Sequence, residues 1–161
     1  MLEAGSQAPP FTLAGTDGRD YRLPRDLRGG PALLFFIKTT CGTCDLTVPY
    51  VNRLRDCYPS GWELWAIAQD PLAEAAAYAD RQGMTYPVLI DAPAYTVSRL
   101  YDPAATPTLF LLAPDGRVQY TTHGFAKDDL NEISRRLAGY VSAQPREIAP
   151  ADDGNPRFKP G

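Results

Sequence analysis

The feature that most constrains the fold is a junction where an apolar run of strand length meets two cysteines and then a helical pattern. The run, Ala32 to Ile37, is apolar at every position, which is typical of a strand buried on both faces of a sheet. Cys41 and Cys44 follow it, and from Leu46 onward apolar residues recur at spacings of three and four, which predicts a helix. The pair is therefore expected at a turn from a buried strand into a helix.

This position favours a reactive thiol. The first residues of a helix have backbone N–H groups without intrahelical partners, and they feel the positive end of the helix dipole. Thiols in such settings have pKa values of roughly 3.5 to 7.5, against about 8.5 for a free thiol. We therefore expect Cys41 to attack a disulfide, and Cys44, one turn further along the same side of the helix, to resolve the mixed disulfide.

Length and charge limit the classes of function. The chain has 161 residues, and a single domain is expected for this length. Its net charge is −3, and it has one histidine. The charges are mixed in sign, with no basic face for nucleic acid and no polybasic patch for a membrane surface. No export signal or membrane span is recognisable, so we expect a cytoplasmic monomer. A mature form that has lost an export signal is the alternative, and Met1 weighs against it.

The rest of the chain alternates strand and helix patterns. A hairpin is expected between Phe11 and Leu23, around Asp17-Gly18. Strand patterns then cover residues 63–68, 88–91, 108–112 and 118–122, and helical patterns cover 71–83, 95–101 and 127–140. Asp70 is expected to cap the helix that begins at Pro71. This order predicts an α/β fold with a central mixed sheet flanked by helices.

The composition changes abruptly after Ala143. Residues 144–161 are rich in Pro, Asp and Gly and poor in aliphatic side chains, a composition that favours disorder. We therefore expect one domain at residues 1–143, followed by a disordered tail at residues 144–161.

Two motifs resemble a known family. Cys41-Gly42-Thr43-Cys44, with Pro49 five residues after the second cysteine, resembles the Cys-Gly-Pro-Cys active-site helix of thioredoxin. Thr106-Pro107, directly before the strand pattern at 108–112, is similar to the cis-proline strand of that family, and Gly124 is similar to the glycine after its last hairpin. The likeness covers about residues 1–141.

The N-terminal hairpin and the strand and helix inserted before the proline strand resemble the TlpA/ResA branch, the redoxins, which share this insertion with AhpC/TSA peroxiredoxins. The resemblance implies a thioredoxin-like fold and a thiol-disulfide oxidoreductase that acts on disulfides in protein substrates. It implies no bound cofactor, but it requires an external dithiol reductant. Cys41 and Cys44 would form the redox-active disulfide, and the substrate groove would be lined by Gly42, Thr43, Thr106 and Pro107.

One departure from the thioredoxin pattern concerns proton transfer. Phe35 stands where thioredoxin carries a buried aspartate that relays a proton to the resolving cysteine. The sequence therefore does not identify the base that accepts the proton of Cys44.

Two other functions compete with the oxidoreductase. The first is an antioxidant thiol peroxidase, but its signature Pro-x-x-x-Thr-x-x-Cys is absent before each of the three cysteines. The second is a non-catalytic metal-binding module that uses the pair with Cys57 or His123. Cys57 lies thirteen residues after Cys44, about 20 Å along the same helix at ~1.5 Å per residue, so it cannot join the pair in one metal site. We interpret Cys57 as a small apolar residue and His123 as a surface or packing residue.

Overall fold

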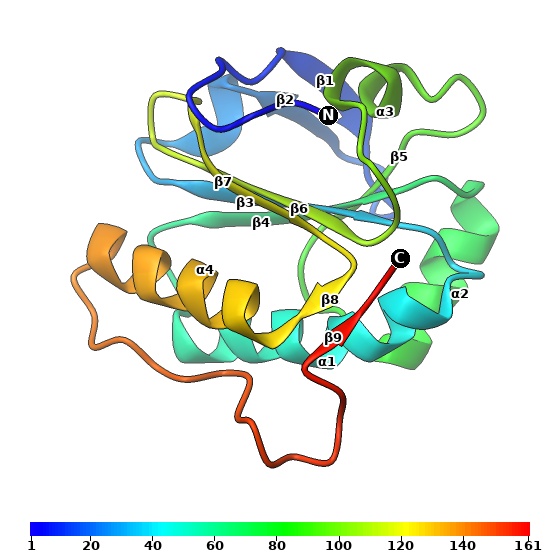
Figure 1. Ribbon diagram of the computed structural model, residues 1–161. Helices are drawn as coiled ribbons and strands as arrows, with labels where there is room; N and C mark the ends of the chain where they lie inside the picture. Colours follow the sequence, from blue (N-terminus) through cyan, green and yellow to red (C-terminus); the bar gives the residue numbers. More distant parts are fainter.

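The computed structural model describes all 161 residues and is built around a five-stranded mixed sheet (Figure 1). The strand order is β5–β4–β3–β6–β7. The central strand β3 (Ala32–Ile37) pairs in parallel with β4 (Glu63–Ala68), and β4 pairs in parallel with β5 (Val88–Ile90). On its other edge β3 pairs antiparallel with β6 (Thr108–Leu112), which pairs antiparallel with β7 (Val118–His123). The predicted α/β architecture with a mixed sheet is confirmed.

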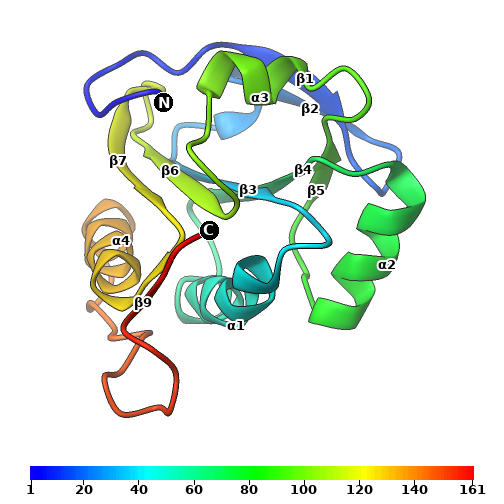
Figure 2. The same ribbon diagram turned by 45° about the vertical axis from the view of Figure 1, so that its right-hand side comes forward.

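Both faces of this sheet are covered (Figures 1 and 2). One face packs against three helices: α1 (Gly42–Cys57), α2 (Leu72–Gln82) and α4 (Lys127–Tyr140). The other face packs against the predicted hairpin of β1 (Phe11–Ala14) and β2 (Asp20–Leu23), the 3-10 helix η1 (Arg25–Leu27) and the short helix α3 (Thr96–Tyr101). None of the helices combines the length and the apolarity that crossing a lipid bilayer requires.

The apolar run in β3 supplies both cores. Successive side chains of a strand point to opposite faces, so Leu33, Phe35 and Ile37 face the helices α1, α2 and α4. The alternate residues Ala32, Leu34 and Phe36 face the hairpin and α3. A polar side chain at any of these positions would be buried without water, which explains why the run has no alternation of polar and apolar residues.

Residues 144–161 do not form the disordered tail that their composition predicts. They run back across α4 and α1, and Ile148 and Ala149 are buried in the core that these helices share. Further on, β9 (Phe158–Lys159) pairs antiparallel with β8 (Phe125–Ala126). The domain therefore extends beyond residue 143. Polar side chains of α1 and α4 hold the segment by hydrogen bonds to its backbone, and the segment has no apolar stripe of its own. For this reason its composition wrongly predicted disorder.

Candidate active site

Cys41 lies at the turn between β3 and α1, as the sequence predicts. It is the N-cap residue of α1, with an extended backbone (φ −99°, ψ 112°), and its Sγ accepts a hydrogen bond from the backbone N–H of Cys44 at 3.2 Å. The side chain thus takes the place that Ser or Asp takes at an ordinary helix start. A sulfur in this position is next to the unpaired N–H groups of the first turn.

This environment favours the thiolate of Cys41. Partial burial raises the pKa of Cys41, but hydrogen bonds from the Cys44 thiol and from the backbone N–H groups of Thr43 and Cys44 outweigh it. The resulting pKa lies below the ordinary value of a cysteine, in agreement with the expectation from the helix N-terminus. Cys41 is also partly accessible to solvent, so its sulfur can meet a substrate.

Cys44 has the opposite character. Its side chain is 0% exposed and belongs to the same core cluster as Phe35 and Val48. Burial raises the pKa of the Cys44 thiol far above its ordinary value, and a hydrogen bond to Cys41 acts in the same direction. The two thiols of the pair therefore differ, because the pKa of Cys41 is lowered and the pKa of Cys44 is raised.

The proline strand lies against the pair. The Thr106–Pro107 peptide bond is cis, as the resemblance implied. The Cys41 thiol donates a hydrogen bond to the carbonyl oxygen of Thr106 at 3.1 Å. Pro107 itself is buried at the start of β6. The structure thus brings Thr106 and Pro107 together with Cys41, although 65 residues separate Thr106 from Cys41 in the chain.

Gly42 and Thr43 are the first two residues of α1. Gly42 is exposed, whereas the Thr43 side chain is buried because residues near the end of the chain lie over it. Its Oγ1 donates a hydrogen bond to the carbonyl oxygen of Pro160 at 2.9 Å. The hydroxyl of Thr43 is therefore already hydrogen-bonded within the chain.

Asp70 has a role that the sequence did not reveal. It does not cap α2, which begins at Leu72 without any side-chain cap. Its carboxylate instead accepts hydrogen bonds from the backbone N–H and the hydroxyl of Thr39, at 2.8 and 2.9 Å. This contact holds the loop that leads from β3 into Cys41, so Asp70 fixes the approach to the cysteine pair from the neighbouring strand end.

Comparison with known proteins agrees with this geometry. The AhpC/TSA family model matches residues 4–121. The chain belongs to the AhpC/TSA family. It is 34% identical over 134 residues to the thiol-disulfide oxidoreductase ResA of Geobacillus thermodenitrificans, which covers 81% of this chain and 76% of that protein. It is 31% identical over 142 residues to ResA of Bacillus anthracis, which covers 87% of this chain and 78% of the relative.

Solved structures show the same fold. A protein from Chlorobium tepidum, described as a thiol:disulfide interchange protein DsbE, superposes with a TM-score of 0.78 at 26% identity, over 88% of this chain and 99% of that one. The thioredoxin domain of a thiol-disulfide oxidoreductase from Bacteroides vulgatus superposes with a TM-score of 0.74 at 20% identity, over 85% and 99%. Within the AhpC/TSA family, the chain is therefore a TlpA/ResA-like redoxin with a thioredoxin-like fold.

The residues that a metal module would need are not assembled. Cys57 is the last residue of α1, at the opposite end of the helix from the pair. His123 is exposed at the end of β7, so of the two alternatives it is a surface residue rather than a packing residue. No group of three or more His, Cys, Asp or Glu side chains is arranged to hold a metal ion.

Proposed function

We propose that Cys41 is the attacking sulfur and Cys44 the resolving sulfur of a thiol-disulfide oxidoreductase. The observation that carries the assignment is the asymmetry of the pair, because Cys41 is partly exposed with a lowered pKa and Cys44 is fully buried with a raised one. The activity itself agrees with the relatives, which are named thiol-disulfide oxidoreductases. The protein is an oxidoreductase that acts on disulfides.

The reaction follows from the two positions. The Cys41 thiolate attacks one sulfur of a substrate disulfide, so that a mixed disulfide forms and the other substrate sulfur leaves as a thiolate. Cys44 then loses its proton and attacks the Cys41 sulfur. The Cys41–Cys44 disulfide forms, the second substrate sulfur leaves, and two electrons have passed from the protein to the substrate. An external dithiol returns these electrons by the same steps in reverse.

We further propose that the substrates are proteins whose disulfide lies in an extended segment. The substrate groove that we expect beside Cys41 would lie between the first turn of α1 at Gly42 and Thr43 and the Thr106–Pro107 loop. The carbonyl oxygen of Thr106 lies 3.1 Å from the Cys41 sulfur, so a peptide backbone that meets this sulfur also meets the loop. A disulfide in an extended segment can enter this space more easily than one inside a folded core.

Single cysteine variants test the assignment. Cys41→Ser should abolish reduction of insulin disulfides, whereas Cys44→Ser should still attack and should accumulate mixed disulfides through Cys41. Cys57→Ser is the matched control and should retain full activity, because Cys57 lies at the far end of α1. Adducts that form through Cys44 or Cys57, identified by mass spectrometry of the trapped species, would refute the roles.

A cytoplasmic location is a further proposal. Thiols are kept reduced in that compartment, which suits a pair that gives electrons to disulfides. Cell fractionation combined with alkylation of the free thiols tests it, and recovery of the protein outside the cytoplasmic fraction would contradict it.

A further inference from the structure

Residues 157–161, here called the cover segment, lie over the groove beside the cysteine pair. Figures 1 and 2 show this segment running beside β8 toward the space between the start of α1 and the loop before β6. It pairs with β8 as the strand β9, with Lys159 opposite Phe125. The backbone N–H of Lys127 also donates to the carbonyl oxygen of Arg157 at 2.9 Å. The cover segment is thus an extended peptide that β8 holds by strand addition.

The cover segment touches both walls of the groove. On the helix side, the carbonyl oxygen of Pro160 accepts the hydrogen bond from Thr43. On the loop side, Gly161 packs so closely that an added Cβ would lie 2.6 Å from the carbonyl oxygen of Thr106. A Cβ on Gly124, whose φ is +71°, would lie 2.8 Å from the carbonyl oxygen of Lys159. An extended substrate that reached Cys41 along this groove would need the space that the cover segment fills.

A buried lysine anchors the chain just before the cover segment. Lys127, the first residue of α4, is 2% exposed, and its ammonium group is hydrogen-bonded within the loop formed by residues 150–155. It donates to Oδ1 of Asp153 at 2.5 Å and to the carbonyl oxygens of Pro150 and Asn155 at 2.8 and 3.0 Å. A hydrogen bond from Lys127, joined by one from Tyr50, holds the pKa of Asp153 well below its usual range.

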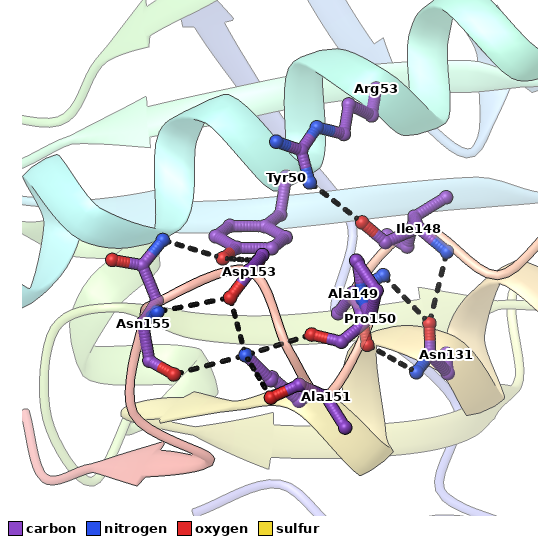
Figure 3. A network of polar contacts seen from close by, with 10 residues as sticks. Tyr50, Arg53, Asn131, Ile148, Ala149, Pro150, Ala151, Asp153 and Asn155 are labelled. Atoms are coloured by element: carbon purple, nitrogen blue, oxygen red, sulfur yellow. Dashed lines mark hydrogen bonds and ion pairs between the residues drawn. The ribbon is translucent and has the colours of Figure 1, made fainter.

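Ile148 and Ala149, which precede this loop, are hydrogen-bonded to α4 and α1. Asn131 on α4 accepts hydrogen bonds from the backbone N–H groups of Ile148 and Ala149, at 3.0 and 2.9 Å, and donates to the carbonyl oxygen of Ala149 at 2.9 Å. Arg53 on α1 donates to the carbonyl oxygen of Ile148 at 2.9 Å (Figure 3). Every residue of the cover segment, by contrast, is exposed, and Phe158 is 59% exposed. The cover segment is therefore more exposed than the buried residues that anchor the chain before it.

We propose that the cover segment is an intramolecular competitor for the substrate groove, held in place by Lys127 and displaced by extended polypeptide substrates. This inference rests on the proposed function, because it names what occupies the site in the absence of substrate. A protein disulfide can bind only to molecules whose cover segment is open, so its apparent affinity falls by the open fraction. A small reagent, which needs only the partly exposed sulfur of Cys41, is hindered less.

The test compares access to Cys41 when the anchor is weakened. Lys127→Met removes the ammonium group and keeps an apolar stem of similar length, whereas Asp153→Asn keeps the shape and removes one charge. Arg135→Met is the matched control, because Arg135 lies on the same helix, is exposed, and has a side chain that is paired only with Glu132. In each variant, Cys41 is alkylated with iodoacetamide and with a maleimide coupled to polyethylene glycol, and the site is assigned by tandem mass spectrometry.

We expect Lys127→Met to raise the rate with the bulky maleimide about tenfold or more, with a smaller rise for Asp153→Asn and none for Arg135→Met. The rate with iodoacetamide should change by less than about threefold. A capped peptide with the sequence of residues 156–161, added in excess, should restore protection in Lys127→Met. Hydrogen exchange at the β8 amides reports whether the cover segment has been released, and circular dichroism reports whether each variant is folded.

Two results would overturn the inference. The first is an unchanged rate with the bulky reagent in a folded variant whose β8 amides have lost protection. The second is an equal rise with both reagents, which would place the effect on the sulfur rather than on access. If Lys127→Met does not fold, Asp153→Asn alone decides. Since alkylation needs no turnover, a wild-type protein without disulfide reductase activity would contradict the proposed function and leave this test intact.

Discussion

The contact between Asp70 and Thr39 predicts how strongly the loop before Cys41 is held in place. Asp70 is 8% exposed, and its two carboxylate oxygens accept from the backbone N–H and the hydroxyl of Thr39 at 2.8 and 2.9 Å. In Asp70→Ala both hydrogen bonds disappear, and the N–H of Thr39 is left with less access to water than in an unfolded chain. The loop before Cys41 should then lose its fixed conformation.

The size of the effect follows from the two bonds. A hydrogen bond to a charged group contributes about 1.5 to 3 kcal/mol, so Asp70→Ala should lower the free energy of unfolding by roughly 3 kcal/mol or somewhat more. For a chain of this length, 1 kcal/mol shifts the midpoint of thermal unfolding by about 2 to 4 °C, so a decrease of roughly 6 to 12 °C is expected. Asp70→Asn keeps one acceptor oxygen, and the Thr39 hydroxyl can turn to accept from the new amide. The decrease in the free energy of unfolding should therefore be less than half as large in Asp70→Asn as in Asp70→Ala.

Thermal unfolding of the reduced protein, followed by circular dichroism, measures the stability. Iodoacetamide alkylation of Cys41 measures the second consequence, because a loosened N-cap weakens the hydrogen bonds that lower the Cys41 pKa, and the rate at neutral pH should fall. Asp152→Ala is the control, since Asp152 is exposed in the loop after Ala151 and far from Thr39 in sequence. An Asp70→Ala variant that unfolds at the wild-type temperature would refute the reasoning.

Three further predictions concern the cysteine pair. Cys44→Ala should raise the midpoint pH of Cys41 alkylation, because the hydrogen bond from the Cys44 thiol stabilises the Cys41 thiolate; an unchanged midpoint in a pH series would contradict this. Phe35→Asp should lower the free energy of unfolding by about 3 kcal/mol or more in denaturant titrations, because it places a carboxylate in the core. Stopped-flow kinetics should show that Cys44 resolves the mixed disulfide faster in this variant. Resolution at the wild-type rate would exclude a proton relay at position 35. Cys41 should react more slowly with hydrogen peroxide than with a peptide disulfide, because the peroxidase signature is absent; faster peroxide consumption would favour the antioxidant alternative.

Local patterns were enough to predict the centre of the fold and the place of the cysteine pair at a helix start. The strand at 32–37 is apolar throughout because both of its faces are buried, so its sequence alone predicts a strand in the centre of the sheet. The cysteines follow within a few residues, and their place at a helix start depends only on neighbours in the chain. The cis bond before Pro107 was predicted by resemblance rather than by periodicity, since no local pattern distinguishes it from the other prolines.

The contacts that were missed join residues far apart in the chain. Asp70 precedes a proline and a helical pattern, so the local signal favoured a helix cap, but its carboxylate meets Thr39, 31 residues earlier. Lys127 opens a helix, where a lysine is normally exposed. Here its ammonium is enclosed by backbone carbonyls and Asp153, and a segment without an apolar pattern becomes ordered. Composition measures the apolar surface that a segment can bury, and it does not report a cation supplied from elsewhere.

Two long-range contacts act on the turn that carries Cys41, one before it in the chain and one after it. Asp70 holds Thr39, two residues before Cys41, while the cover segment accepts a hydrogen bond from Thr43, two residues after it. The first contact is formed by a largely buried carboxylate, and the second by an exposed strand tip. Loss of Asp70 should therefore change the reactivity of the sulfur toward every reagent, whereas loss of Lys127 should change access for bulky reagents alone. Because the two effects act on different quantities, the rates of an Asp70→Ala, Lys127→Met double variant should equal the product of the single effects. A strong deviation would mean that the cover segment also positions Cys41, and that access and reactivity at this site are coupled.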